Sequence, residues 1–385
     1  MPIDPRQPAP TPHDGAQSVE VQSAGARSAG TPLAGARAVT AVAPAKINLL
    51  LAVGDLRPDG FHDVRTVYRA VDLWEEVTVG FAEPGGDAGP EGSGGATGPD
   101  DDDMAITVTG PGADQVPTDR TNLAARAVDL LSREAGSDAR FAIRIRKGVP
   151  VAGGMAGGSA DAAAALVATN RLLGLGLSRA ELEERGARLG SDVPFCIRGG
   201  TAVGTGRGEE LATLLHARTP QHVVVALADG GLSTPAVFGE LDRLRAEHSA
   251  DPDPDPGRDT ERALKAHRVS GTDGLVMALA ESDPAAVAEL LANDMEPAAL
   301  SLMPALRRTL RAGEEAGALH GMVSGSGPTC LFFCSDREHA ISVAAEISES
   351  GVAREVRITS GPVGGAHITD GPGSGPSAAQ RFTGK

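Results

Sequence analysis

The stretch Lys147–Ala165, KGVPVAGGMAGGSADAAAA, decides the fold of this 385-residue chain. It follows the alternating segment Arg140–Arg146 (RFAIRIR), which predicts a half-buried strand. It leads into the Ala-rich segment Gly157–Leu173, which predicts a helix beginning at about Gly158. The sequence therefore places a glycine-rich loop between a strand and the N-terminus of a helix.

The glycines of this loop are suited to binding an anion; they are Gly153, Gly154, Gly157 and Gly158. Without side chains they let backbone N–H groups approach a phosphate closely, and the helix N-terminus adds a partial positive charge. Ser159, in the first helical turn, supplies a hydroxyl for phosphate or a bound cation. The alternative is a turn that only begins a packing helix, but the glycines and serine at this junction favour phosphate. The loop is not of the Walker A type, because no Gly-Lys-Ser/Thr follows it.

Composition and charge argue against several classes of function. The net charge of −16 does not suit a general nucleic-acid-binding protein, which needs clustered Lys and Arg. Aromatic residues make up only 3% of the chain, too few for a stacking platform along a long single strand. No apolar run approaches the ~18–20 residues of a membrane span, so we expect no membrane partner.

The cysteines and the N-terminus bear on the cellular compartment. Cys196, Cys330 and Cys334 are too few for a disulfide framework or a thiolate metal cage. The N-terminus lacks a charged segment followed by an apolar one, so it does not predict a secretory signal. The histidines show no metal-ligand spacing, and we assign no metal site. These observations predict a cytoplasmic protein.

Four segments are rich in small, polar or acidic residues and carry no hydrophobic periodicity: 1–37, about 84–103, 251–257 and 361–385. Such segments bury too little apolar surface to offset their ordering entropy, so we expect them to be disordered. A composition shift near 205–220 predicts a domain boundary. We therefore expect an N-terminal domain over 38–210, with the insertion at 84–103, and a C-terminal domain over 211–360.

Strand and helix patterns mix without strict alternation between these segments, which favours an α+β fold over a doubly wound parallel sheet. Further strands are expected over Ala41–Val53, Glu76–Phe81, His222–Ala228, Ala353–Ile358 and, as a strand–turn–strand, Gly321–Cys334. Helices are expected over Asp119–Ala135, Ser178–Leu189, 234–247, 260–268, 284–293, 301–316 and Glu338–Glu349. Ser178 and Glu181 predict a capping box at the start of their helix.

Other motifs indicate which class of phosphate-binding protein the glycine-rich loop belongs to. PAKINLLL begins at Pro44, RPDGFHDVRTV follows at Arg57–Val67, and LGSDVPFCIRGGTAVGTGRGE occupies Leu189–Glu209. With the glycine-rich loop and SGSGPT at Ser324–Thr329, these motifs occur in the order typical of the GHMP kinase superfamily, which the chain resembles. Within the superfamily, the resemblance is to the branch that phosphorylates a cytidine-diphosphate-linked methylerythritol. It extends over about residues 44–330, most of the expected folded body.

The resemblance implies a two-domain kinase with its active site in the cleft between the domains. This branch transfers the γ-phosphoryl group of ATP to the tertiary 2-hydroxyl of its acceptor, in the non-mevalonate (MEP) pathway to isoprenoid precursors. Such a transfer needs a base near the hydroxyl and cationic charge stabilisation. The motifs place these roles on Asp192 as the base and Lys46 as its cationic partner. Asn48 points to the same face of its strand as Lys46, and either contacts the acceptor or is structural.

The resemblance also assigns ATP to the glycine-rich loop: Pro150, Val151, Ala152, Gly153, Gly154, Met155, Ala156, Gly157, Gly158, Ser159 and Ala160. Gly158 stands where the superfamily usually has the first serine of Gly-Ser-Ser-Ala, so fewer hydroxyls are present to bind Mg²⁺ directly. Mg²⁺ is expected to accompany the nucleotide. Lys147 either contacts the nucleotide or is a solvated strand end. The SGSGPT turn is expected to pack against the loop and shape the site.

Selectivity for the acceptor is expected at its cytidine end. Phe61 and Phe238 align with the family's aromatic residues around cytosine, where stacking on a base contributes ~1–3 kcal/mol. His62 is expected to read the Watson–Crick edge, and Thr234, in the same STPAVF segment as Phe238, is assigned to the acceptor site. Phe61 replaces a tyrosine often found in the family, which removes a hydroxyl but keeps the ring face. Without the resemblance, Phe238 would be interpreted as an ordinary core residue.

Two alternative functions compete with this one. The first is another small-molecule kinase of the superfamily, of the homoserine or mevalonate type, and the DGFH and TPAVF elements count against it. The second is a catalytically silent nucleotide-binding regulator on the same fold. The presence of both Lys46 and Asp192 argues against such a regulator.

Overall fold

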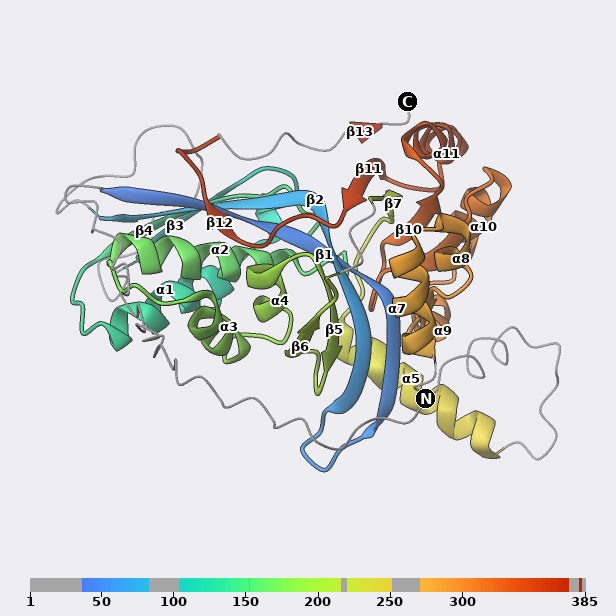
Figure 1. Cartoon of the computed structure of the whole chain (residues 1–385), viewed down its shortest axis with the longest axis horizontal. Helices are drawn as coiled ribbons and strands as arrows, with labels where there is room; N and C mark the ends of the chain where they lie inside the picture. Colours follow the sequence, from blue (N-terminus) through green and yellow to red (C-terminus); the bar gives the residue numbers. More distant parts are fainter. Residues whose placement is uncertain are drawn as a thin grey trace, which may run out of the picture. The chain divides into compact units, whose positions relative to one another are not determined.

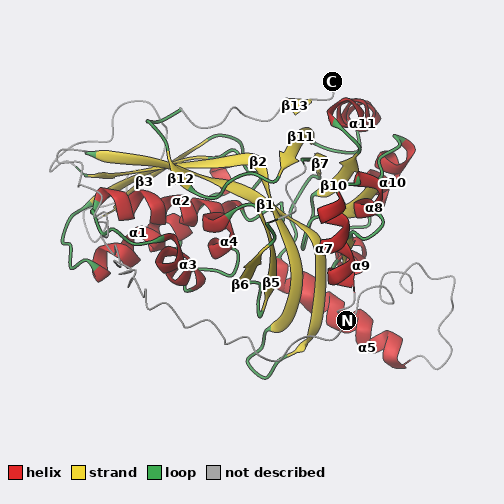
Figure 2. Ribbon diagram, in the orientation of Figure 1, coloured by secondary structure: helices red, strands yellow, loops and turns green. Residues whose placement is uncertain are grey.

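The computed structural model describes residues 37–82, 104–151, 153–215, 220–250, 271–373 and 381–382. The segments expected to be disordered over 1–36, 84–103 and 251–257 lie outside the described residues, as do Ala152 and the expected helix over 260–268. In the described part of the chain, strands and helices form two sheets with helices packed beside them (Figures 1 and 2). No helix in this part is long and apolar enough to cross a membrane.

Two long antiparallel strands, β1 (Ala38–Leu56) and β2 (His62–Phe81), form the centre of the larger sheet. Both are curved, and the pair extends from beside α2 to beside α7 in Figure 1. Their pairing shifts register at three places, one of them between Pro44 and Ala45, and such irregularities bend and twist a strand. The strands expected over Ala41–Val53 and Glu76–Phe81 lie within this pair.

The other strands of the larger sheet flank this pair, and helices cover one of its faces (Figure 2). The strands are β3 (Met104–Thr109), β4 (Phe141–Arg146), β5 (Thr201–Thr205), β6 (Glu210–Thr213), β8 (Ala292–Asn293) and β12 (His367–Ile368). The helices are α1 (Leu123–Glu134), α2 (Gly157–Leu172), α3 (Arg179–Ala187) and α4 (Val193–Arg198), and a 3₁₀ turn spans Ala113–Gln115. The small alanine side chains of α2 pack into the same buried core as Val77 and Val79 of β2.

The smaller sheet has the strand order β13-β11-β7-β10-β9. Its strands are β7 (Gln221–Leu227), β9 (His320–Val323), β10 (Cys330–Cys334), β11 (Glu355–Gly361) and β13 (Arg381–Phe382). The accompanying helices are α5 (Thr234–Ala250), α7 (Gly271–Glu281), α8 (Pro284–Ala288), α9 (Glu296–Leu302), α10 (Leu306–Glu315) and α11 (Arg337–Ser350). Val224 and Phe332 are completely buried in a core that also contains Val343 and Ile347 of α11. The mixture of sheets and helices confirms the expected α+β fold.

Capping residues mark the starts of two helices in the larger-sheet part of the molecule. Ser178 and Glu181 form the predicted capping box at the start of α3. The helix predicted from Asp119 begins instead at Leu123, because Asn122 caps it by accepting a hydrogen bond from the backbone N–H of Ala124. Polar caps therefore fixed two helix starts, although the sequence pattern identified only one of them.

Two of the expected helices are wrong in extent. The helix expected over 284–293 ends at Ala288, and the chain continues into β8, which pairs in parallel with β1. The helix expected over 301–316 is two helices, α9 and α10, separated around Pro304. Proline has no N–H for a helical hydrogen bond, which explains the interruption.

Part of the segment 361–385, which was expected to be disordered, is structured. β11 continues to Gly361, and the chain is then described through residue 373. In this segment β12 pairs with Ala41 and Val42 of β1, and the backbone N–H of Gly373 donates to Glu76 Oε2. The absence of hydrophobic periodicity did not prevent order here, because main-chain pairing to a sheet edge does not require it. β8 and β12 belong to the larger sheet although both follow the predicted boundary near residue 210.

Candidate active site

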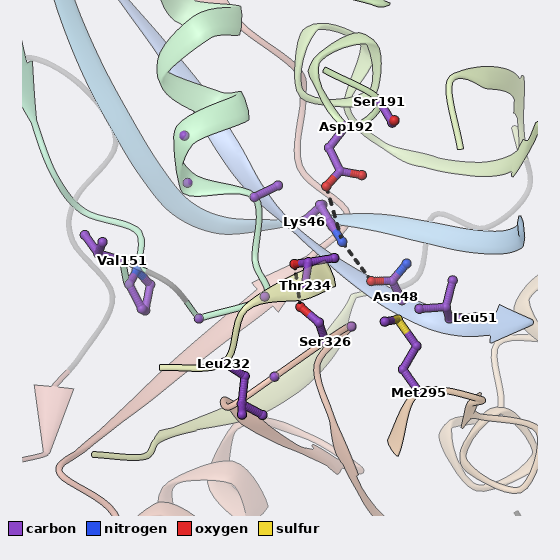
Figure 3. Close-up of a pocket in the computed structure, with 18 of the residues that line it drawn as sticks. Lys46, Asn48, Leu51, Val151, Ser191, Asp192, Leu232, Thr234, Met295 and Ser326 are labelled. Atoms are coloured by element: carbon purple, nitrogen blue, oxygen red, sulfur yellow. Dashed lines mark hydrogen bonds and ion pairs between the residues drawn. The ribbon is translucent and has the colours of Figure 1, made fainter. Parts of the chain in front are cut away.

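A cavity of about 490 Å³ is bordered by the glycine-rich loop, by β1 and β2, and by segments next to the smaller sheet. Its lining residues include Lys46 of β1, Gly154 and Gly157 of the loop, and Thr234 and Ser326. Figure 3 shows Lys46, Thr234 and Ser326 close together. The motifs that carry the family resemblance thus converge on one space from distant parts of the sequence.

Lys46 and Asp192 lie together at this cavity, as predicted. Lys46 projects from β1, and Asp192 precedes the first residue of α4. The Lys46 Nζ atom lies 3.6 Å from Asp192 Oδ2 (Figure 3). The lysine side chain is 8% exposed and the aspartate side chain 29%, so the carboxylate is accessible from the cavity while the ammonium group is largely enclosed.

Neighbouring side chains hold this pair in place. Lys46 Nζ donates to Asn48 Oδ1 over 2.9 Å, and Asn48 Nδ2 donates to Thr66 Oγ1 over 2.7 Å. The Tyr68 hydroxyl donates to Asp192 Oδ1 over 3.1 Å. Burial and the adjacent carboxylate raise the pKa of Tyr68 well above its ordinary value, so this hydroxyl remains a donor. Both ends of the Asn48 amide are thus used in orienting Lys46.

The glycine-rich loop ends at α2 with its backbone groups open to the cavity. Ala156, the N-cap of α2, has a left-handed conformation (φ 59°) and makes no side-chain capping bond. The first N–H groups of a helix have no intrahelical partners, so those of Gly157 and Gly158, which line the cavity, are suited to an anion. The backbone N–H of Lys46 donates to the Met155 carbonyl over 3.2 Å, which ties the loop to β1.

The SGSGPT turn packs against this loop, which confirms the expected contact. A Cβ atom added to Gly154, whose φ is +69°, would lie 2.2 Å from the Ser324 carbonyl oxygen. One added to Gly153 would lie 2.8 Å from Thr329 Oγ1. The Ser324 hydroxyl donates to the Gly154 carbonyl over 3.3 Å. Only glycine fits where these two backbones meet.

Lys147 is buried beside two carboxylates. Its Nζ atom lies 2.6 Å from Glu75 Oε1 and 2.5 Å from Asp161 Oδ2, and all three side chains are at most 3% exposed. Burial lowers the pKa of Lys147, but the two carboxylates outweigh this effect and raise that pKa. Of the two alternatives for Lys147, the solvated strand end is therefore wrong. Lys147 borders the cavity, and its contact with nucleotide stays a prediction.

Of the residues predicted to surround cytosine, Phe238 and His62 contact each other, whereas Phe61 contacts Arg207. Phe238 borders the cavity, and its ring stacks on that of His62 with centroids 5.0 Å apart. His62 Nδ1 lies 3.0 Å from the Gly54 carbonyl oxygen, and His62 Nε2 lies 3.2 Å from Asp242 Oδ2. Both imidazole nitrogens thus have protein partners. The Phe61 side chain, in a residue 51% exposed, lies under the guanidinium group of Arg207.

Some of the remaining predicted residues line the cavity and others do not. Thr234 Oγ1 forms a 2.9 Å hydrogen bond with Ser326 Oγ (Figure 3). The predicted loop residues that border the cavity are Pro150, Val151, Gly153, Gly154, Ala156, Gly157 and Gly158. Met155, Ser159 and Ala160 are not among its lining residues. Among the described residues, no group of three or more His, Cys, Asp or Glu side chains is arranged to hold a metal ion.

Several site residues were missed by the sequence analysis. Tyr68 lies in an apolar strand pattern, and its contact with Asp192 spans 124 residues of sequence. Glu75 belongs to no quoted motif, and Asp161 lies within the glycine-rich segment but was given no role. Arg207 borders the cavity from the glycine-rich turn GTGRGE. The flanking glycines, Gly206 and Gly208, were the sequence signal for this turn, and both have a positive φ in the structure.

Two family models match separate parts of the chain. Residues 122–200 match the model for the GHMP kinases N terminal domain, and residues 275–353 match that for the GHMP kinases C terminal. The chain is 51% identical over 334 residues to the 4-diphosphocytidyl-2-C-methyl-D-erythritol kinase of Mycolicibacterium smegmatis, covering 87% of this chain and 93% of that protein. It is 51% identical over 328 residues to the same-named kinase of Nocardia farcinica, covering 85% and 95% of the two chains.

Solved structures show the same fold. A crystal structure of 4-(cytidine 5'-diphospho)-2C-methyl-D-erythritol kinase superposes with a TM-score of 0.60 at 25% identity, covering 84% of this chain and all of that one. A homoserine kinase from Cytophaga hutchinsonii superposes with a TM-score of 0.62 at 18% identity, covering 86% and 98% of the two chains. The second likeness shows the fold alone.

Proposed function

Because this chain belongs to the 4-diphosphocytidyl-2-C-methyl-D-erythritol kinases of the GHMP kinase superfamily, we propose that it phosphorylates the tertiary 2-hydroxyl of 4-diphosphocytidyl-2-C-methyl-D-erythritol. ATP supplies the γ-phosphoryl group, and ADP is released. The reaction belongs to the non-mevalonate (MEP) pathway to isoprenoid precursors. The observation that carries the proposed chemistry is the Lys46–Asp192 pair at a cavity bordered by an anion-binding loop.

Asp192 is proposed as the base. Its Oδ1 atom accepts from Tyr68, while Oδ2 faces Lys46. The carboxylate takes the proton of the acceptor hydroxyl as the hydroxyl oxygen attacks the γ-phosphorus, and the bond to the β,γ-bridging oxygen breaks. Lys46 offsets negative charge during the transfer, held in place by Asn48.

The glycine-rich loop is proposed to bind the phosphates of ATP. The support is geometric, because the N-terminus of α2 has no side-chain cap and its first glycines border the same cavity as Asp192. The described residues provide no cluster suited to a protein-bound metal. We propose that Mg²⁺ arrives coordinated by the nucleotide, and no step is assigned to a protein metal ligand.

The cytidine end of the acceptor is proposed to bind near Phe61, His62 and Phe238. Supporting this placement, Phe238 and Arg207 border the cavity, and Arg207 lies over Phe61. One face of Phe238 is covered by His62, so a stacked base would use its other face or displace the imidazole. Thr234, bonded to Ser326, is proposed to contact the acceptor between this end and the catalytic pair.

We also propose a cytoplasmic location. Cys196, Cys330 and Cys334 are unpaired and buried. Burial raises the pKa of each of these thiols, which suppresses the thiolate form that forms disulfides. This fits a protein of a reducing compartment.

The decisive experiment compares ADP release with different acceptors. We would supply MgATP with 4-diphosphocytidyl-2-C-methyl-D-erythritol, homoserine, mevalonate or no acceptor. Stoichiometric ADP and a phosphorylated product are expected with the cytidine compound alone. Preferred turnover of homoserine or mevalonate would contradict the proposed acceptor. ATP binding without turnover of any acceptor would support the silent regulator.

A further inference from the structure

Beside the glycine-rich loop lies a charged cluster to which the proposed function assigns no chemical step; two of its members, Lys147 and Asp161, border the cavity. Glu75 of β2, Lys147 before the loop and Asp161 of α2, here called the buried ion triad, come from three different elements. Each side chain is at most 3% exposed. A lysine with one carboxylate is neutral, but the second carboxylate leaves one excess negative charge in the interior. Such a charge is costly unless it is paired or neutralised by a proton.

One oxygen of the buried ion triad, Asp161 Oδ1, lacks a hydrogen-bond partner. Glu75 Oε1 lies 2.6 Å from the Lys147 Nζ atom and is held by that charged donor. The other carboxylate oxygens are satisfied, because Glu75 Oε2 accepts from the Gly148 backbone N–H and Asp161 Oδ2 from Lys147. A proton on either carboxylate would remove the excess charge, and on Asp161 Oδ1 it would replace an unpaired carboxylate oxygen with an uncharged hydroxyl.

The buried ion triad contacts both ends of the loop. At the entrance, Glu75 Oε2 holds the Gly148 N–H at 2.9 Å, while Arg357 of β11 donates to the Gly148 carbonyl over 2.6 Å. At the exit, a Cβ added to Gly157 would lie 3.1 Å from Glu75 Oε1. Asp161 lies on α2, one turn after Gly157. A change of charge here therefore acts on backbone that borders the cavity.

We propose that the buried ion triad retains one proton between its two carboxylates and, in that neutral form, positions the glycine-rich loop to receive nucleotide phosphates. Glu75, Lys147 and Asp161 are thus positioning residues. The inference rests on the proposed function only in assigning ATP to the loop. Loss of the proton leaves a negative charge beneath the loop, which opposes the negative charge of the phosphates.

The ionisation behaviour of the carboxylates supports this arrangement. Burial and the adjacent Asp161 raise the pKa of Glu75 to about 8, and burial also raises the pKa of Asp161. The charged and titratable groups that act on them are Lys147, Arg146 of β4, and the thiol of Cys196 in α4. Both arginine and lysine stay cationic near pH 8, and burial raises the pKa of the Cys196 thiol far above this range. The carboxylates are therefore the groups that titrate.

The test measures binding of adenylyl imidodiphosphate, a non-hydrolysable ATP analogue, by calorimetry from pH 6 to 9.5 without acceptor. Wild-type Kd is expected to rise roughly tenfold above pH 8, equivalent to about 1.4 kcal/mol. Glu75→Gln, which mimics the protonated carboxyl in shape and charge, should remove this rise. Glu76→Gln is the matched control, because Glu76 pairs with Arg146 rather than with Lys147. It should keep the wild-type pH profile, including any contribution from titration of the analogue itself.

An infrared band of a buried protonated carboxyl, present in wild type at pH 7 and lost in Glu75→Gln, is the second readout. It remains decisive if a variant folds poorly, because the wild-type band also disappears at high pH. A flat wild-type Kd, a Glu75→Gln profile that still rises, or absence of the band would overturn the proposal. Because no acceptor is used, failure of the acceptor panel alone would contradict the proposed function and leave this inference standing.

Discussion

The glycine-rich loop and the cytidine end of the cavity are built in different ways. The loop presents backbone N–H groups at the start of α2, and it is supported from beneath by buried charges and from the side by the SGSGPT turn. The cytidine end consists of side chains: Phe61 is 51% exposed, and the ring of Phe238 rests on His62. Its support comes from α5, where Arg245 donates to the Val53 and Gly54 carbonyls.

This difference indicates how each region should respond to change. Backbone ligands have few alternative positions once the chain is packed, so small volume changes at the loop should disturb binding and stability together. Exposed side chains contribute to the binding free energy of a ligand that they touch but little to the free energy of folding. Their removal should therefore weaken the binding of one substrate selectively. Substitutions in the catalytic pair should weaken neither ATP binding nor acceptor binding strongly.

The largest effect is expected for the catalytic pair. Asp192→Asn and Lys46→Ala should each lower kcat by roughly 10²–10⁴-fold, because their interactions matter chiefly in the transition state. The Kd for ATP should remain within several-fold of wild type. The check is steady-state turnover at saturating substrates, together with calorimetric ATP binding. A near-normal kcat for Asp192→Asn would contradict its role as the base.

The next effect tests the rigidity of the loop. Gly154→Ala should raise the KM for ATP by roughly tenfold or more and lower Tm, because its Cβ would lie 2.2 Å from the Ser324 carbonyl oxygen at φ +69°. Gly239→Ala in α5 is the matched control, since no atom lies within 4 Å of its added Cβ. Steady-state kinetics and thermal unfolding report both effects. If the two variants behave alike, the loop is more adaptable than its packing indicates.

A smaller and more selective effect is expected at the cytidine end. Phe61→Ala should raise the KM for the cytidine acceptor roughly tenfold through lost stacking, without changing Tm or the KM for ATP. Phe238→Ala should raise the same KM but also lower Tm, because Phe238 packs against a buried cluster containing Val237 and Leu241. Equal weakening of ATP and acceptor by Phe238→Ala would identify it as a core residue only.

His62→Ala tests discrimination within the same region. If His62 reads the base edge, its loss should improve the relative kcat/KM for the uridine analogue of the acceptor more than it weakens cytidine binding. The measurement is the ratio of kcat/KM for the two compounds in wild type and variant. An unchanged ratio would indicate that His62, held by Gly54 and Asp242, only supports Phe238.

The smallest effect is a pH dependence of stability at Glu75. Its pKa is raised from 4.5 to about 8, so its stabilising contribution is complete below pH 4.5 and is lost as the pH rises through 8. Glu75→Gln does not ionise, so its Tm relative to wild type should increase by at least about 2 °C between pH 5 and 9. Thermal unfolding at both pH values measures this. A constant difference would mean that Glu75 ionises alike in folded and unfolded chains.

The sequence by itself determined the features that depend on neighbouring residues. It predicted the strand, the glycine-rich loop and α2 at residues 140–173, and the capping box at Ser178, because turn glycines, caps and periodicity act within a few residues. Through motifs in family order it also predicted that Lys46 and Asp192 lie together. These residues are 146 positions apart, and no local pattern could have joined them.

The tertiary structure alone decided the surroundings of these residues. Tyr68 beside Asp192, and Glu75 with Asp161 around Lys147, are contacts between elements that look like ordinary strand or helix in the sequence. The same holds for β12, whose order depends on pairing with β1 rather than on its own composition. A buried charge or a sheet edge is satisfied by whichever partner the fold brings near, and that partner leaves no signal in the sequence beside it.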